Sequence, residues 1–379
     1  MATERAQWVH MYAFCYLHMA LHGPIGSYVP WIEESIRIFR EMEKEHSASF
    51  LEECGTLIME KSSNPSSTNP TDWPSYCRAS YQSAVQHGIA VEYLNASALR
   101  ERFPQFRSYD DMVGLLEPGG GFVRCERVTA AALAEAKMAP HVDIMEETKA
   151  VSLKYVPSTE IKPTIEVTLQ TENEKPIVVS TKCLLVCMGA WTGQLFPSWA
   201  PHLRPIRQFQ AWMQVDIHYA DLYSYANMPT WVMVPPHYPL ALYGVPCDVD
   251  DTDGCQQWIK VGIHGRDHYV PDPSTNPVHV SEEERAEVLE SFRHVMPVDR
   301  ISKQLKLAAV KPCFYTMTAD THFMLGTPDG HDQVFCVAGL SGHGYKQAPA
   351  LGQMMVDFAL GNDMSKWNLD FCDPQRFGV

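Results

Sequence analysis

The residues best suited to chemistry gather near the carboxyl end of the chain, in the stretch VFCVAGLSGHGYK (334–346). A short apolar run leads into a turn, and an apolar segment with helical spacing follows it. Glycines let the backbone approach a ligand closely, and the start of a helix offers free N–H groups and positive dipole. His343 and Lys346 add hydrogen-bond donors there. The pattern suits a phosphate, or a ligand that gains negative charge, and it also suits a tight turn whose glycines serve packing only. The glycines of this turn are Gly339, Gly342 and Gly344.

A cysteine lies a short distance upstream, in the extended segment KPCFYTMTADTHF (311–323). Cys313 is flanked by Tyr315 and Lys311, and a neighbouring cation favours the reactive thiolate. A buried cysteine that only packs is the alternative, because cysteine is common in protein cores.

Two further strands carry unusual residues. In WIKVGIH (258–264), alternation places Lys260, Gly262 and His264 on one face. A lysine that points inward from a strand suggests a function, whereas on a solvated face it would be an ordinary surface residue. The segment LLVCMGAWT (184–192) predicts a buried strand that ends in small residues and a tryptophan. Such an end can contact a cofactor, or it can simply form a turn beside a core tryptophan.

The order of these segments resembles the sarcosine oxidase family of FAD-dependent amine oxidases. The resemblance is carried by KVGIH at Lys260, CFYT at Cys313, CMGAW at 187–191 and GLSGHGYK at 339–346. This family includes monomeric sarcosine oxidase, N-methyltryptophan oxidase and the peroxisomal sarcosine and pipecolate oxidases. The resemblance extends from about residue 28 to about residue 370, with its most specific part at the carboxyl end.

The resemblance implies roles for individual residues. Cys313 matches the cysteine that binds FAD covalently through the flavin 8α-methyl group, and Lys260 matches the lysine that activates dioxygen. Tyr315 and Lys346 match residues that line the substrate and flavin pocket, with Lys346 suited to a substrate carboxylate. Other active-site matches are Tyr243, His264 and His343. The positions matched to contact with FAD are Gly120, Gly121, Gly189, Ala190, Trp191, Gly339, Gly342, His343, Gly344 and Lys346.

The amino-terminal part departs from the family pattern. Members of the family open with a strand, a Gly-x-Gly-x-x-Gly turn and a helix, which hold the FAD pyrophosphate. No such motif is present here, and residues 6–36 contain no lysine or arginine to match the family's substrate-carboxylate arginine. We therefore interpret residues 1–27 as an unmatched leader. Because a strand and a nucleotide cradle are missing, we expect weak FAD binding and impaired folding.

Composition narrows the possible partners. The 379 residues carry a formal charge of −15, from 30 Lys and Arg against 45 Asp and Glu. This balance argues against nucleic acid and anionic membranes as partners, and no run of 18 apolar residues predicts a membrane span. The eleven cysteines are odd in number and contain no C-x-x-C pair, which indicates a reducing compartment without a disulfide framework or zinc site. We expect no metal cofactor.

Elements that position these residues follow from periodicity and capping. Helices are expected over 30–46, 81–87, 97–102, 126–138, 281–296 and 348–360, with Ser281 as an N-cap. Strands are expected over 144–156, 164–171, 176–190, 208–215, 230–234, 258–264, 305–318 and 334–338. The resemblance implies a mixed α/β fold. It combines a doubly wound FAD-binding domain, truncated at its amino terminus, with a substrate domain that has a mixed, largely antiparallel sheet. We assign residues 115–200 and 305–365 to FAD binding, and 28–114 and 201–304 to the substrate domain.

The function that the resemblance implies is oxidation of a secondary amine or N-methyl amino acid to an imine, with dioxygen reduced to hydrogen peroxide. FAD is the expected cofactor, bound through Cys313, and a small amine or amino acid and dioxygen are the expected partners. Alternatives are a fructosyl-amine oxidase, a related flavin dehydrogenase, or a non-catalytic remnant without a nucleotide cradle. A monomer is compatible with the sequence. The cytoplasm is the expected location, because the carboxyl end lacks the S-K-L type of peroxisomal signal found in some relatives.

Overall fold

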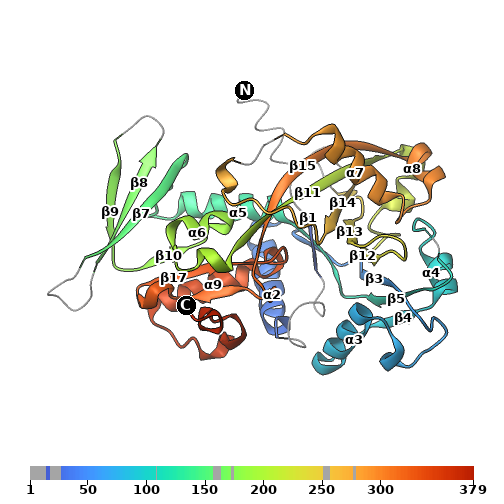
Figure 1. Ribbon diagram of the computed structural model, residues 1–379, viewed down its shortest axis with the longest axis horizontal. Helices are drawn as coiled ribbons and strands as arrows, with labels where there is room; N and C mark the ends of the chain where they lie inside the picture. Colours follow the sequence, from blue (N-terminus) through green and yellow to red (C-terminus); the bar gives the residue numbers. More distant parts are fainter. Residues whose placement is uncertain are drawn as a thin grey trace. The chain divides into compact units, whose positions relative to one another are not determined.

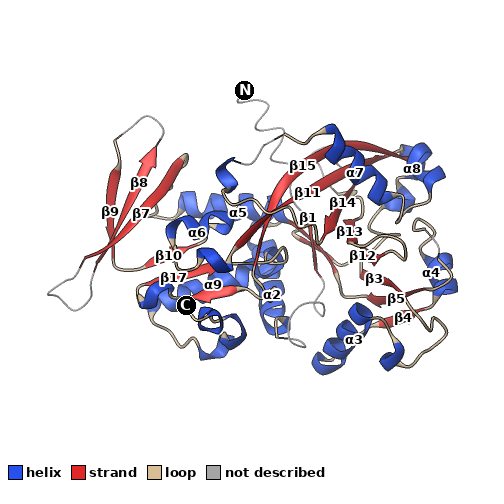
Figure 2. Cartoon of the chain, viewed as in Figure 1, coloured by secondary structure: helices blue, strands red, loops and turns tan. Residues whose placement is uncertain are grey.

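The structure is a computed structural model that describes residues 14–17, 27–107, 109–156, 164–171, 175–250, 257–275 and 279–379. The chain divides into two compact units, each assembled from separate stretches of sequence (Figure 1). Unit 1 contains residues 1–130, 208–267 and 277–313, and unit 2 contains 131–207, 268–276 and 314–379. Both units mix helices and strands, which confirms the predicted mixed α/β class (Figure 2).

Unit 1 is built on an eight-stranded sheet in the order β15-β11-β14-β13-β12-β3-β5-β4. Strands β12 and β3 run parallel, while the pairs β11–β14, β14–β13, β12–β13, β3–β5 and β5–β4 are antiparallel. The strands of this sheet are β3 (Thr56–Lys61), β4 (Glu92–Leu94), β5 (Met112–Glu117), β11 (Arg204–Val215), β12 (Thr230–Val234), β13 (Ala241–Val245), β14 (Trp258–His264) and β15 (Leu305–Met317). The first residues of β11 and the last of β15 belong to unit 2.

Shorter elements complete unit 1. A three-stranded antiparallel sheet has the order β1-β6-β2. Its strands are β1 (Phe14–Leu17), β2 (Leu51–Glu52) and β6 (Gly121–Arg124). The helices are α2 (Val29–His46), α3 (Ser75–His87), α4 (Ala96–Arg102), α7 (Glu282–Phe292) and α8 (Val298–Gln304), and α5 (Cys125–Met138) begins in this unit.

One face of the eight-stranded sheet supplies the main core. Alternate residues of each strand point to the same side of a sheet, and on this side they are almost all apolar. Leu57, Phe209, Leu242 and Val261 are each 1% exposed or less. Helix α7 packs on this core through Val288 and Phe292. The opposite face carries the polar side chains of the candidate site.

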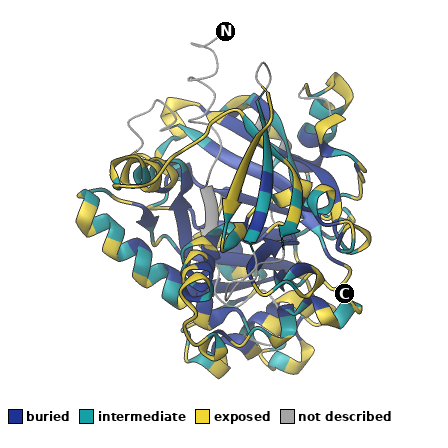
Figure 3. Cartoon of the chain, turned by 90° about the vertical axis from the view of Figure 1, so that its left-hand side faces the viewer, coloured by how far each residue is buried: buried dark blue, intermediate teal, exposed yellow. Residues whose placement is uncertain are grey.

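Unit 2 contains two three-stranded sheets, β10-β17-β16 and β7-β8-β9. Strands β10 and β17 are parallel, and the other pairs are antiparallel. Strand β9 is exposed along most of its length, as Figure 3 shows for this part of the chain. The strands are β7 (Thr148–Val156), β8 (Thr164–Thr171), β9 (Ile177–Thr181), β10 (Leu184–Val186), β16 (Met324–Gly326) and β17 (Val334–Ala338). The α-helices that lie wholly in this unit are α6 (Thr192–Leu195) and α9 (Ala348–Leu360).

Several predicted elements differ from the structure. The single strand expected over 176–190 is wrong: it divides into β9 and β10, which belong to different sheets, because Lys182 and Cys183 interrupt it. Strand β10 is also only partly buried, with Leu185 39% exposed. The helix that starts at Ser281 ends at Phe292, before the predicted residue 296, although the capping box between Ser281 and Glu284 is present. Helix α8 was not predicted.

Candidate functional site

Three of the predicted site residues lie on one face of the eight-stranded sheet. Lys260 and His264 alternate with Gly262 along β14, and register places Tyr243 of β13 opposite Gly262. On the other side of β14, Gln210 lies opposite Gly262 and Trp212 lies opposite Lys260. Directly paired residues project to the same side of a sheet. We call this surface the lysine face; it consists of Gln208, Gln210, Trp212, Tyr243, Lys260, Gly262 and His264.

The lysine face is polar but largely buried. Lys260 is 4% exposed, Tyr243 is 8% exposed and Trp212 is 2% exposed. The possibility that Lys260 is an ordinary surface residue is therefore wrong for this structure. Burying a charged ammonium is costly unless partners or a function compensate for the lost hydration. Burial also lowers the pKa of His264 from its usual value of 6.5. The face thus places a buried lysine one row from the phenol of Tyr243 and two rows from the imidazole of His264.

Gly262 makes room for Tyr243. A Cβ atom built on Gly262 would lie 2.4 Å from both Cζ and Oη of Tyr243. The tyrosine ring therefore occupies the space above the glycine, between the rows of Lys260 and His264. A side chain at position 262 would force the phenol to move.

The end of β14 is held by ionic contacts. Arg266 donates from Nε and Nη2 to the two carboxylate oxygens of Glu287, at 3.0 and 2.8 Å. Its guanidinium also lies 4.3 Å from the centroid of the Phe209 ring. In addition, Nε2 of Gln208 donates to the carbonyl of Arg266 at 3.1 Å. These contacts fix the strand end that carries His264.

Cys313 lies on β15 and is partly buried, the last residue of unit 1. Lys311 is two residues away on the same strand, and burial lowers the pKa of its ammonium. The structure thus keeps the lysine and the thiol on one side of an extended strand. The possibility of a fully buried core cysteine does not hold at this position.

In unit 2, the glycine-rich turn after β17 packs tightly on the end of β15. A Cβ on Gly342 would lie 2.5 Å from the ring of Tyr315, and one on Gly339 would lie 2.6 Å from Thr318. Both glycines have positive φ, of 80° and 59°. The backbone N–H of Ser341 donates to the carbonyl of Thr316 at 3.0 Å. Packing and backbone conformation therefore account for these glycines whatever ligand the turn binds.

The same turn carries a stacked histidine and a buried lysine. The His343 ring stacks on Phe323 with centroids 4.7 Å apart, and its Nε2 lies 3.2 Å from the carbonyl of Thr321. Lys346 is 1% exposed and lies in the 3-10 turn Tyr345–Gln347 that precedes α9. The neighbouring Gln347 is fully buried, and neither polar atom of its amide has a hydrogen-bond partner within the described part of the chain. The turn therefore holds polar groups that a bound ligand could satisfy.

The segment around Gly189 is more open than predicted. A Cβ on Gly189 would meet no atom within 4 Å, although its φ of 52° still favours glycine. Trp191 is 37% exposed, so the alternative of a core tryptophan is wrong. Its ring packs edge-on against Phe314, and its Nε1 donates to Ser274 at 3.0 Å. Ala190 is buried beside it.

Gly120 and Gly121 serve the small sheet of unit 1. A Cβ on Gly121 would lie 1.9 Å from the carbonyl oxygen of Glu52, so only glycine fits against β2. The carbonyl of Gly120 accepts a hydrogen bond from Gly55 at 2.9 Å. Contact with a cofactor remains a prediction for both residues.

Sequence reasoning missed the two glutamines of the lysine face. Gln208 is 2% exposed, and the Oε1 atoms of Gln208 and Gln210 are both buried without a hydrogen-bond partner. The alternation QFQAW over 208–212 was the available signal, because it places both amides on the side opposite the core residues Phe209 and Ala211.

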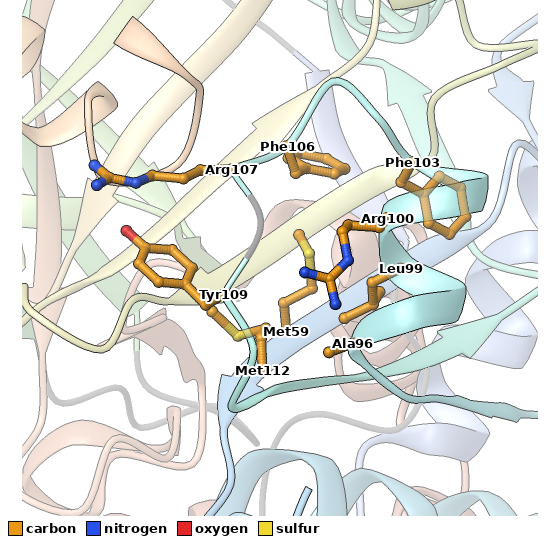
Figure 4. Close-up of a pocket in the computed structure, with 9 residues that line it drawn as sticks. All are labelled: Met59, Ala96, Leu99, Arg100, Phe103, Phe106, Arg107, Tyr109 and Met112. Carbon is orange, nitrogen blue, oxygen red and sulfur yellow. The ribbon is translucent and has the colours of Figure 1, made fainter.

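A small cavity lies on the other face of the sheet, beside helix α4 (Figure 4). Its lining is mostly apolar, and its volume is about 20 Å³. A cavity of that size holds about one water molecule, which is too little for an amino acid. The lining residues are Met59, Ala96, Leu99, Arg100, Phe103, Phe106, Arg107, Tyr109 and Met112.

Within the described stretches of the chain, no group of three or more His, Cys, Asp or Glu residues is arranged to hold a metal ion. None of the helices described there is both long and apolar enough to cross a membrane.

Comparisons with known proteins identify the family. Residues 5–358 match the family model described as "FAD dependent oxidoreductase". This match begins before residue 28, the position at which the resemblance in sequence motifs starts. The chain is 29% identical to an N-methyl-L-tryptophan oxidase of Salmonella typhi over 290 residues, which is 75% of this chain and 69% of that protein.

Two solved structures share the fold. Glycine oxidase from Geobacillus kaustophilus has a TM-score of 0.70 at 15% identity, covering 95% of this chain and 86% of the other. Amadoriase I from Aspergillus fumigatus, a fructosyl amine:oxygen oxidoreductase, has a TM-score of 0.68 at 16% identity, covering 96% and 80%. The predicted relationship to flavin-dependent amine oxidases is confirmed, and the chain belongs to the family of FAD-dependent oxidoreductases.

Proposed function

We propose that this chain oxidises a secondary or N-methyl amino acid to an imine and reduces dioxygen to hydrogen peroxide. The amine gives up two electrons and two protons, counting its N–H proton and the C–H hydrogen. One dioxygen takes up both electrons and both protons, and water then hydrolyses the imine. FAD, when bound, would carry the electron pair from the amine to dioxygen.

The observation that carries this proposal is the buried lysine of the lysine face. Lys260 is 4% exposed on a strand that also presents His264. A fixed cation in a site with little water stabilises negative charge as it develops. The one-electron reduction of dioxygen creates such a charge. We therefore propose that Lys260 favours direct use of dioxygen over transfer of electrons to a protein partner.

The other polar groups fit the handling of a neutral amino acid. Burial keeps the His264 imidazole uncharged at neutral pH because it lowers its pKa. A neutral ring can accept a proton or hydrogen-bond to the amine without repelling it. Tyr243 supplies a phenol in the next row. In unit 2, Lys346 would attract a substrate carboxylate, and Tyr315 would line the pocket.

The described residues fit part of an FAD site. Gly189 offers an open backbone at positive φ, and the turn before α9 has an unsatisfied amide at Gln347. Cys313 is partly buried and lies two residues from Lys311 on β15, so it would hold FAD as a thioether to the 8α-methyl carbon. Forming that bond would release one proton from the thiol and one from the methyl group, and the flavin ring would take up the two electrons. We therefore propose Cys313 of unit 1 as the covalent attachment point. Within unit 2, we propose that Trp191, His343 and Lys346 contact FAD.

The sequence contains no Gly-x-Gly-x-x-Gly turn, the motif that holds the pyrophosphate of FAD in this family. This observation favours a second candidate, a non-catalytic remnant that binds FAD weakly or folds poorly. The acidic charge still argues against nucleic acid as a partner. The cytoplasm stays a prediction from the sequence.

Two measurements test the proposal. Oxygen uptake and peroxide release are followed with sarcosine, pipecolate, N-methyltryptophan and fructosyl-lysine. The proposal is supported if sarcosine, pipecolate or N-methyltryptophan causes oxygen uptake and an equal amount of peroxide is formed. Activity with fructosyl-lysine alone would point to the fructosyl-amine alternative. No oxygen uptake from a protein that is yellow and folded would contradict an oxidase function.

Intact-protein mass spectrometry tests the attachment. The purified chain is expected to carry the mass of one FAD, and Cys313→Ser is expected to lose it while staying folded. Cys183→Ser, at another partly buried cysteine, is the matched control and should keep the adduct. An adduct that survives Cys313→Ser would place the linkage elsewhere, and a colourless wild-type protein would favour the remnant.

A further inference from the structure

Two glutamines on the lysine face are not explained by the roles given above. Gln210 lies directly opposite Gly262, in the same row as Tyr243, and Gln208 precedes it on the same face of β11. Rows of the sheet on either side contain Lys260 and His264. Gln210 is partly exposed as a residue, although its Oε1 atom is buried. The residue therefore lies among the groups proposed for catalysis.

Among the residues that the structure describes, the carbonyl oxygens of both amides have no hydrogen-bond partner. Each Oε1 is buried and accepts no hydrogen bond in the structure. For Gln208, the donation from Nε2 to the carbonyl of Arg266 fixes which end of the amide is the acceptor. A buried acceptor without a donor is destabilising, because its hydrogen bonds to water are lost and not replaced. That cost is recovered if a bound ligand brings a donor.

The residues around Oε1 of Gln210 indicate which kind of ligand group could donate a hydrogen bond to it. The lysine face contains one lysine, two amides, a phenol, an imidazole and an indole, and its residues include no carboxylate. A carboxylate would stabilise a protonated amine and so keep the nitrogen lone pair occupied. An amide oxygen accepts an N–H without adding negative charge, and the nearby ammonium of Lys260 further disfavours a second cation. The face is thus suited to a neutral amine.

We propose that Oε1 of Gln210 accepts a hydrogen bond from the N–H of the reacting amine, an inference that rests on the proposed function. A neutral secondary amine has one N–H and one lone pair. Fixing the N–H against Gln210 sets the direction of the lone pair, which must be free for oxidation. A tertiary amine has no such hydrogen in its neutral form, so the site selects secondary over tertiary amines.

The experiment compares binding of an N-methyl and an N,N-dimethyl form of the same amino acid by titration calorimetry on the purified protein. The wild type is expected to bind the N-methyl form about tenfold more tightly, the effect of one hydrogen bond. Gln210→Leu should remove this preference, with little effect on the dimethyl form. Gln210→Met, which keeps the length of the side chain, is measured beside it in case the leucine variant does not fold. Gln214→Leu, an exposed glutamine on the same strand and face, is the matched control and should behave as wild type.

Each remaining outcome overturns the inference. If both Gln210 variants still prefer the N-methyl form as the wild type does, Gln210 does not accept the proposed hydrogen bond. If the variants bind the N-methyl and N,N-dimethyl forms equally more weakly than the wild type, Gln210 has a structural role. If the wild type binds neither amino acid, the proposed amine-binding site at Gln210 is wrong. Peroxide release from the same preparations shows separately whether the proposed oxidase function stands.

Discussion

The ring of Tyr243 occupies the space that a side chain on Gly262 would need. The two residues face one another on neighbouring strands, and a Cβ on Gly262 would lie 2.4 Å from the phenol oxygen. The position of this phenol on the lysine face thus depends on a glycine that itself has no chemical group to offer.

Replacement of Gly262 by alanine is expected to displace Tyr243 and reduce kcat/KM at least tenfold. Overpacking of this kind costs about 1–3 kcal/mol of stability, so the variant should still fold. Gly352→Ala is the control, because a Cβ there meets no atom within 4 Å in helix α9, and it should stabilise the protein by about 0.4–1 kcal/mol. Urea unfolding and steady-state kinetics measure both effects. Full activity in Gly262→Ala would show that the position of the phenol does not matter.

A buried ion pair gives a prediction about stability. Arg124 is 2% exposed and binds both carboxylate oxygens of Asp248, itself 1% exposed. Asp248→Asn leaves the buried guanidinium with Glu52 at 3.2 Å and Asp250 at 3.8 Å as its remaining counter-charges. The bidentate contact with Asp248 is lost, so we expect a loss of about 1–3 kcal/mol. Glu41→Gln, at an exposed pair with Arg37, should cost less than about 1 kcal/mol. Equal losses in urea unfolding would contradict the distinction between the two pairs.

His264 predicts a dependence of stability on acid pH. Burial lowers its folded-state pKa below the usual 6.5, so the unfolded chain binds a proton first as the pH falls. The contribution of His264 is therefore complete above pH 6.5 and is lost as the pH falls through the folded pKa. The difference in unfolding free energy between wild type and His264→Gln should shrink over that range. A difference that does not vary with pH would show that the imidazole is not protected from protonation.

Glu60 predicts the opposite trend. Burial raises its pKa above 4.5, although its carboxylate accepts a hydrogen bond from the backbone N–H of Cys77 at 2.8 Å, near the start of α3. The stability that Glu60 contributes is complete below pH 4.5 and is lost as the pH rises through the folded pKa. Glu60→Gln keeps an acceptor for Cys77 and should gain stability relative to wild type as the pH rises. A stability difference between Glu60→Gln and wild type that stays constant as the pH rises would contradict the explanation.

Local patterns in the sequence predicted the elements but not their partners. The capping box at Ser281 and the alternation of WIKVGIH gave helix α7 and the shared face of Lys260 and His264 correctly. The parallel pairing of β12 with β3 joins Thr230 to Thr56, and nothing local at either position indicates it. The strand division at Lys182 was missed because both halves are equally rich in β-branched and aliphatic residues.

Some residues of the candidate site were predicted from the sequence, and others were not. Lys260 was recognised because alternation places it on one face with Gly262 and His264, and a lysine that points inward from a strand is unusual. Gln208 and Gln210 were not, because glutamine on a strand usually indicates the solvent side, and their burial depends on the sheet as a whole. The resemblance to amine oxidases supplied the roles of Cys313 and Lys346, which no local pattern defines. The expected weakness of FAD binding stays a prediction.

The reaction of the reduced protein with dioxygen tests most directly whether Lys260 makes this chain an oxidase. Stopped-flow measurements separate this step from reduction by the amine, in wild type, Lys260→Met and the exposed control Lys306→Met on β15. Lys260→Met is expected to slow the dioxygen step about 100-fold or more, the effect of losing one stabilising group, and to leave reduction by the amine within about tenfold. Lys306→Met should match wild type in both steps. A dioxygen step of unchanged rate in Lys260→Met would contradict the account.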